Sequence, residues 1–135
     1  MRLRRGTFAA VLWLLAGPAL ADTVLPIGAA FGNEAGCAMY MSGDRSPPDL
    51  AVLTPHTFTT HNIGCYFETL ISNRDGKLEV AALCATPEDR REKATVVVEG
   101  NRSAGYTVTK GADSWGPLTL CPGMEELFTL PGVQV

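Results

Sequence analysis

The sequence predicts an all-β domain, a single antiparallel meander that forms a curled sheet or small barrel and is held by two disulfides. Short runs of β-favouring residues are separated by 14 glycines and nine prolines along 135 residues, a pattern that is typical of many short strands. A hairpin signal occupies the middle of the chain, and four cysteines follow an export leader. A chain of this length favours one domain with one core.

Residues 1–21 have the pattern of a secretory signal peptide. Three arginines lie within the first five residues, Phe8–Ala16 is an unbroken apolar run, and Ala19-Leu20-Ala21 is a small-x-small cleavage site. The nine apolar residues are about half of the roughly 20 that a membrane-spanning helix needs. We therefore expect residues 22–135 to be one exported domain, periplasmic or secreted, with no membrane span in the mature chain.

The charge balance disfavours a nucleic-acid partner. Without the three leader arginines the chain has 14 acidic against eight basic residues, a formal charge of −6. A protein that binds a phosphate backbone needs a basic face. The hydrophobic content of 46% also excludes a disordered chain.

Apolar and β-branched runs predict strands at Val24–Ile27, Leu50–Leu53, Thr57–Ser72, Lys77–Ala85, Ala94–Glu99, Tyr106–Lys110 and Leu118–Cys121. The stretch Gly28–Pro48, which is rich in glycine and ends in two prolines, is expected to be an irregular loop attached through Cys37. Thr86–Lys93 begins with a capping threonine and a proline, with acids early and bases late. That order predicts a short surface turn of helix.

Asn73-Arg74-Asp75-Gly76 is the clearest structural signal. A two-residue Asp75-Gly76 turn places Arg74 opposite Lys77. One face of the hairpin then collects Ile63, Cys65, Phe67, Thr69 and Ile71 with Leu78, Val80, Ala82 and Cys84, while the charged residues collect on the other. A three-residue turn would mix the two faces, so the segregation of apolar residues favours the two-residue turn.

Cys37, Cys65, Cys84 and Cys121 are expected to form two disulfides, because the chain is small and its leader directs it to an oxidising compartment. Their spacing contains no C-x-x-C pair, which disfavours a zinc site or a dithiol redox centre. The two-residue turn makes Cys65 and Cys84 diagonal neighbours rather than direct partners. We therefore favour Cys37–Cys65 and Cys84–Cys121, although spacing alone leaves three connectivities open.

The sequence contains no G-x-S-x-G, H-E-x-x-H or phosphate-binding glycine motif. His56 is expected in an exposed turn and His61 at the edge of the apolar strand face. Trp115 and Tyr106 are expected to close an end of the barrel, and the alternative is that they form an aromatic contact surface. We therefore expect no catalytic residue, no metal site and no cofactor, and the protein is interpreted as a non-enzyme.

Ser42-Gly43-Asp44-Arg45-Ser46 resembles the Ser-Gly-x-Arg-Tyr loop of the bacterial periplasmic inhibitors of c-type lysozyme. In that family a small disulfide-bearing β-barrel inserts the loop into the lysozyme cleft. The resemblance implies that Ser42 and Arg45 contact the partner, since a hydroxyl and a guanidinium suit a pair of carboxylates. Ser46 stands where the family has tyrosine.

The chain as a whole resembles uncharacterised small secreted four-cysteine proteins of proteobacteria. The resemblance rests on the leader, on Cys-x-Phe at Cys65–Phe67 and on Val-x-x-Leu-Cys at Val80–Cys84, and it implies no known activity. The expected function is that of an exported, non-catalytic binding or envelope-associated protein with an unidentified protein or envelope partner; the alternative is a lysozyme inhibitor. The polar loop Ala38–Asp49 is the expected recognition element.

Overall fold

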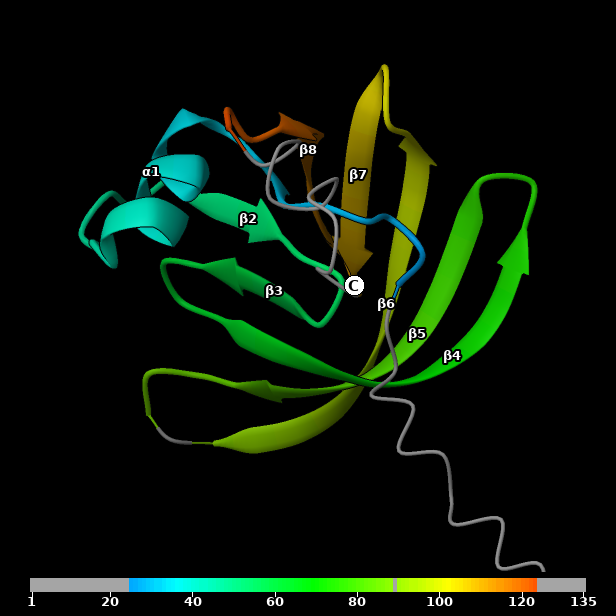
Figure 1. Ribbon diagram of the computed structural model, residues 1–135. Helices are drawn as coiled ribbons and strands as arrows, with labels where there is room; N and C mark the ends of the chain where they lie inside the picture. The colour runs from blue at the N-terminus through cyan, green and yellow to red at the C-terminus, as the bar shows by residue number, and fades with distance from the viewer. Residues whose placement is uncertain (1–24, 89, 124–135) are drawn as a thin grey trace, which may run out of the picture.

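An antiparallel meander that closes on itself is the architecture of this protein (Figure 1). The structure, a computed structural model, describes residues 25–88 and 90–123. Within these residues eight strands pair in chain order, and the last strand pairs with the first to close a barrel. The all-β prediction is confirmed. The predicted signal peptide, residues 1–21, lies outside the described residues.

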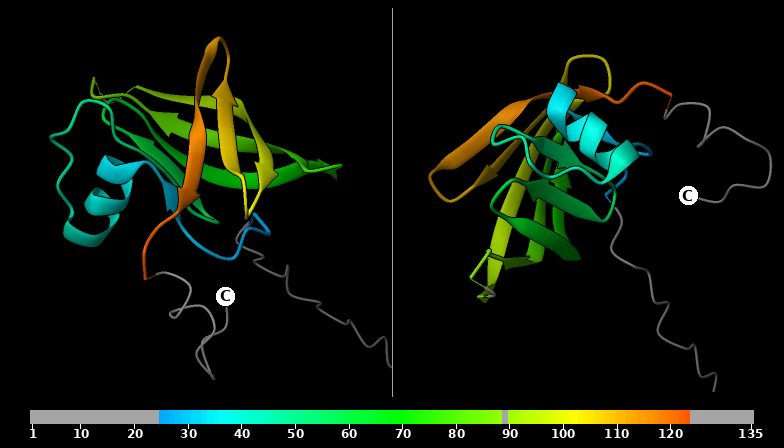
Figure 2. Two further views of the ribbon diagram at one scale, coloured as in Figure 1. Left: turned by 90° about the horizontal axis from the view of Figure 1, so that it is seen from above. Right: turned by 90° about the vertical axis from the view of Figure 1, so that its left-hand side faces the viewer.

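The described elements, in chain order, are β1 (Phe31–Gly32), α1 (Glu34–Ser42), β2 (Ala51–Leu53), β3 (Thr57–Thr60), β4 (Gly64–Arg74), β5 (Lys77–Ala85), β6 (Arg91–Asn101), β7 (Gly105–Lys110) and β8 (Asp113–Leu120). The helix lies on the outside of the barrel, where it contacts β1 and β2 (Figure 2). No helix in the described part of the chain is long and apolar enough to cross a membrane.

Apolar side chains from alternate strand positions fill the barrel. β5 has a regular alternation of buried and more exposed residues, as a strand with one face on a core requires. Phe31, Phe58 and Phe67 are among the barrel's largest fully buried side chains. The interior of an eight-stranded barrel is just wide enough for side chains to fill, so the middle of this barrel is a packed core.

Several predicted elements are corrected by the structure. The single strand expected over Thr57–Ser72 is two strands, β3 and β4, because Thr60 Oγ1 accepts hydrogen bonds from the backbone N–H groups of Asn62 and Ile63 and fixes a turn there. The strand expected at Val24–Ile27 is wrong in its described part: Leu25 and Ile27 are buried in the core without belonging to a strand.

The short helix expected over Thr86–Lys93 is also wrong. β6 begins at Arg91 and its first residues pair with the end of β5, with Arg91 opposite Ala85 and Glu92 opposite Cys84. Pairing along nine residues of β5 outweighs a local helix preference that has no apolar stripe to support it.

The turn of the central hairpin is as predicted, but the register beyond it is not. Asp75 and Gly76 both have positive φ, 51° and 76°, and Arg74 lies opposite Lys77, as a type I′ turn requires. Two β-bulges, at Glu68 and Ile71, then each shift the pairing by one residue. A bulge leaves one residue unpaired and reverses which residues face inward.

The bulges explain why the predicted disulfide pairing is wrong. Together they bring Cys65 directly opposite Cys84, and these two form one disulfide, with Cα atoms 4.0 Å apart. Cys37 of α1 therefore bonds to Cys121, with Cα atoms 5.4 Å apart and a sequence separation of 84. All four cysteines are bonded. Two disulfides are consistent with an oxidising, exported location.

The same bulges correct the predicted inner face. The prediction is confirmed for the β5 residues Leu78, Val80, Ala82 and Cys84, which are buried, and for β4 as far as Phe67; it is wrong for Thr69 and Ile71, which are exposed. Leu70 is half-buried and packs against the core, whereas Ile71 is 54% exposed.

A helix replaces the expected loop between Gly28 and Pro48. Asn33 caps α1: its Oδ1 accepts from the backbone N–H groups of Gly36 and Ala51, at 2.7 and 3.1 Å, and its Nδ2 donates to the carbonyl of Asp49 at 2.6 Å. A Cβ at Gly36 would lie 2.0 Å from the carbonyl oxygen of Ala51. Glycine at this position therefore allows α1 to approach the barrel wall.

Tryptic mapping without reduction tests the disulfide pairing, because cleavage after lysine and arginine places each cysteine in a different peptide. We expect the peptide that ends at Arg45 to be joined to the one that begins at Gly111. The peptide 46–74 should be joined to 78–90. A mass that joins the Arg45 peptide to 46–74 would contradict the register described above.

Candidate functional site

One end of the barrel has the two longest connections, β1–β2 with its helix and β5–β6. Because the strands are antiparallel, the α1–β2 connection and the β3–β4, β5–β6 and β7–β8 turns lie at the same end. In Figure 1, α1 and the β3–β4 and β5–β6 turns lie on one side and the β4–β5 turn lies opposite. We call this first side the loop end. Residues that bind partners are found mainly on such connections, held by a rigid scaffold.

The loop over residues 43–50 is attached to the β3–β4 turn by two hydrogen bonds. Arg45 Nη2 donates to the carbonyl of Thr60 at 3.2 Å, and His61 Nδ1 lies 2.9 Å from the carbonyl oxygen of Arg45. A carbonyl oxygen can only accept, so Nδ1 of His61 carries the hydrogen. In the neutral ring Nε2 is then an unprotonated acceptor.

The loop also has an internal turn. Asp44 Oδ1 accepts from the backbone N–H of Ser46 at 3.0 Å and from its hydroxyl at 2.7 Å. The hydroxyl bond, followed by the backbone bond, lowers the pKa of Asp44 below its ordinary value because both bonds favour the carboxylate. Most of this loop is solvent-exposed, yet hydrogen bonds within the loop and to the β3–β4 turn fix its shape.

The structure places Ser42 and Arg45, the two residues predicted to contact a partner, in different surroundings. Ser42 is the last residue of α1, and its hydroxyl donates to the carbonyl of Ala38 at 2.8 Å and accepts from the N–H of Asp44 at 3.3 Å. Arg45 is exposed and bonds to Thr60. The two side chains therefore hydrogen-bond to separate elements.

The shortness of β1 leaves a gap in the barrel wall at the loop end. The described pairs between β1 and β8 are Phe31 with Leu120 and Gly32 with Thr119. Residues 113–118 of β8 have no strand paired on that side in the part of the chain described. β2 likewise begins only at Ala51.

Trp115 fills part of this gap. Its ring packs on Phe58 of β3, with ring centroids 5.1 Å apart and planes at 56°, and the side chain remains half-buried. Tyr106 lies deeper, edge-on to Phe31 with centroids 4.8 Å apart. Burial raises the pKa of Tyr106, and the charge of Arg102 partly opposes this shift. Both aromatic residues pack against the core.

A hollow of about 450 Å³ opens beside Trp115. Leu50 and Thr60, both buried, line it together with the apolar side chains of Pro48 and Ile63. Its volume lies at the small end of the range for ligand pockets, roughly 300–1,000 Å³.

Four exposed polar residues complete the hollow: Asp49, His61, Asn62 and Asp113. Neither the Asp49 nor the Asp113 carboxylate has an ion-pair or hydrogen-bond partner among the described residues. The hollow thus combines an aromatic wall with acceptors and an amide, all accessible to solvent. Sequence reasoning missed it, because its residues come from four separate connections and strands.

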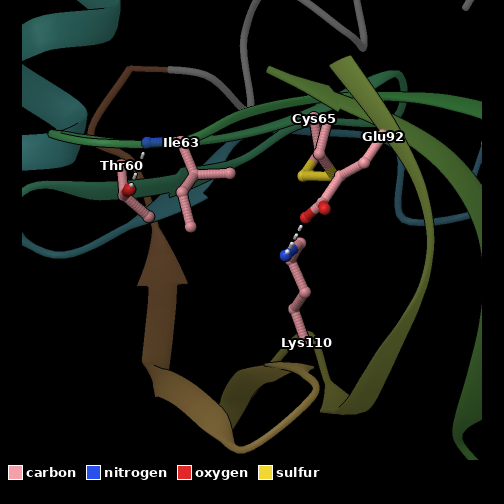
Figure 3. Close-up of a disulfide and its surroundings, with 6 residues drawn as sticks. Thr60, Ile63, Cys65, Glu92 and Lys110 are labelled. Atoms are coloured by element: carbon pink, nitrogen blue, oxygen red, sulfur yellow. Dashed lines mark hydrogen bonds and ion pairs between the residues drawn. A yellow bond between two sulfur atoms is a disulfide. The ribbon is translucent and has the colours of Figure 1, made fainter. Parts of the chain in front are cut away.

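A polar pair lies at the same end. Lys110 Nζ is 3.2 Å from Glu92 Oε1, and Figure 3 shows the two side chains pointing toward each other near Cys65. Lys110 is 19% exposed and Glu92 60% exposed. A partly exposed pair contributes little to stability, about 0–1 kcal/mol. Its importance is that Lys110 has a local counter-charge.

The two histidines do not form a common site. His56 precedes β3 and His61 follows it, so they lie at opposite ends of the barrel. Among the described residues no group of three or more His, Cys, Asp or Glu side chains is placed to hold a metal ion.

Comparison of the chain with protein-family models, with curated proteins and with solved structures finds no match. The geometry of the loop end is therefore the basis for the functional argument.

Limited proteolysis tests whether His61 holds the loop. We expect His61→Ala to raise the rate of tryptic cleavage after Arg45 by about 3- to 10-fold, the value of one lost hydrogen bond when cleavage follows local opening. Cleavage after Arg102, at the opposite end, is the internal control and should not change. Equal acceleration at both sites would mean that the substitution loosens the whole barrel.

Proposed function

We propose that this protein is an exported, non-catalytic binding module that recognises a component of the cell envelope through the loop end of its barrel. The observation that carries the proposal is the attachment of an exposed polar loop to the β3–β4 turn, through Arg45 and His61, beside an accessible hollow. A recognition surface of this kind is held ready before the partner arrives, which lowers the entropy cost of binding.

The separation between an apolar barrel interior and a polar rim supports the loop end as the binding surface. The barrel interior is a packed apolar core, so the middle of the barrel has no room for a ligand. Exposed polar side chains with unused donors and acceptors gather at the rim instead. The formal charge of −6 on residues 22–135 would add long-range attraction toward a cationic partner at low salt.

Site-specific photo-cross-linking in the exporting cell tests the proposal. A benzophenone amino acid at Ser46, in the loop, should become covalently attached to an envelope component on irradiation. The same amino acid at Ser103, an exposed serine in the β6–β7 turn at the other end, should give little adduct. Adducts from Ser103 alone, or from both positions equally, would exclude the loop end as the recognition surface.

Inhibition of a c-type lysozyme is a second candidate. The closed, disulfide-bearing barrel is the architecture that the resemblance of the Ser42–Ser46 segment implies, and Arg45 is exposed at the loop end. A guanidinium that meets an active-site carboxylate forms charge-assisted hydrogen bonds.

A lysozyme activity assay tests this narrower hypothesis. If it holds, the wild-type protein inhibits the enzyme and Arg45→Ala weakens inhibition by about tenfold or more, the value of one charged hydrogen-bond contact. Arg74→Ala, which removes an exposed arginine from the opposite end, should inhibit like wild type. Absence of inhibition by wild type, or equal inhibition by Arg45→Ala, removes the hypothesis.

A further inference from the structure

We propose that the hollow beside Trp115 binds one pyranose ring of a neutral saccharide. The inference rests on the proposed function and names the chemistry of the envelope component. Three features of the hollow support it. One side is an aromatic wall, the rim carries hydrogen-bonding groups, and the hollow opens at the barrel surface, so a ligand can reach both.

The aromatic wall is positioned before any ligand arrives. Trp115 packs on Phe58, so its ring orientation is fixed while part of its surface faces the hollow. The face of an aromatic ring is negative, and a pyranose presents C–H groups, which are weakly positive, along its own faces. Stacking of these two faces buries apolar area on both sides.

The rim supplies the complementary polar groups. A saccharide hydroxyl is both a donor and an acceptor, so its site needs acceptors and donors together. The carboxylates of Asp49 and Asp113 are acceptors, the imidazole of His61 adds a further hydrogen-bonding group, and the side-chain amide of Asn62 supplies both donors and acceptors. No hydrogen bond within the described chain occupies the two carboxylates or the Asn62 amide.

The charges nearby favour a neutral ring over an anion. The hollow itself is lined by two carboxylates, which would repel an acidic ligand. Two cations of the loop end are already engaged: Arg45 donates to Thr60, and Lys110 pairs with Glu92. A simple amine is the competing ligand, because two carboxylates and one tryptophan can also hold a cation.

Intrinsic fluorescence provides a direct test. Trp13 lies in the predicted signal peptide, so Trp115 is the single tryptophan of the processed chain and reports the hollow alone. The exported protein is titrated with glucose, N-acetylglucosamine and the disaccharides built from each. We expect a saturable change with at least one of them that is independent of salt. n-Butylammonium chloride and glycerol are the comparison ligands, a cation and a polyol without a ring.

Matched variants assign the response to the rim. Asp113→Ala should weaken saccharide binding by about tenfold, since it removes a charged hydrogen-bond acceptor. Glu99→Ala removes an exposed carboxylate of β6 whose partner is Lys77, and should change binding by less than about twofold. Equal loss in both variants would show that net charge, rather than the hollow, decides binding.

Further outcomes separate this inference from the function on which it rests. No saturable response to any saccharide, or a salt-dependent response to n-butylammonium alone, overturns the inference. Cross-linking from Ser46 without a saccharide response would leave the proposed function standing and remove the inference alone. A saccharide response without cross-linking from Ser46 would support the inference and show that the hollow, rather than Ser46, contacts the ligand, whereas adducts from Ser103 alone would remove the proposed function. Co-sedimentation with isolated cell-wall polymer, competed by the active disaccharide, then identifies a bound glycan rather than a free sugar as the source.

Discussion

Closure of the barrel depends on a very short contact between its first and last strands. Two residue pairs join β1 to β8, and the N–H of Cys121 adds a hydrogen bond to the carbonyl of Ala30 at 2.9 Å. The disulfide from Cys37 to Cys121 stabilises this short contact, because it joins α1 to the residue that follows β8, at a sequence separation of 84. In the chain-entropy model a loop of that length is worth about 4–5 kcal/mol, a large part of the stability of a small domain.

The same short strand creates the candidate site. A longer β1 would pair with residues 113–118 of β8 and cover the space beside Trp115. Because β1 ends at Gly32 and the chain turns into α1 at Asn33, the wall stays open there, and the chain returns along residues 43–50 to border the opening. Asn33 joins these parts, since it caps α1 and donates to the carbonyl of Asp49. Both the closure of the barrel and the candidate site therefore depend on one segment, the short β1 and the Asn33 cap that follows it.

The sequence predicts the strands whose apolar pattern repeats along their length. It does not predict the features that depend on one residue, such as a β-bulge. The alternation from Lys77 to Ala85 predicts β5 with its bounds. The bulges at Glu68 and Ile71 each depend on a single unpaired residue and leave no periodic signal, so the pairing of Cys65 was misread. α1 buries chiefly Gly36 and has no apolar stripe, so helix periodicity could not reveal it. The hollow lies beside the loop that follows α1, so it could not be predicted from a sequence that does not reveal α1.

The buried core and the exposed rim of the hollow differ in how freely their residues can be substituted. The residues that close and fill the barrel are buried, and substitutions among them cost several kcal/mol. The rim residues Asp49, His61, Asn62 and Asp113 are exposed, where most substitutions change stability by about 0.5 kcal/mol or less. Trp115 belongs to both sets, since it packs on Phe58 and also faces the hollow. The aromatic wall is therefore constrained by folding, whereas the hydrogen-bonding rim around it can be substituted with little loss of stability, as the proposed saccharide specificity requires.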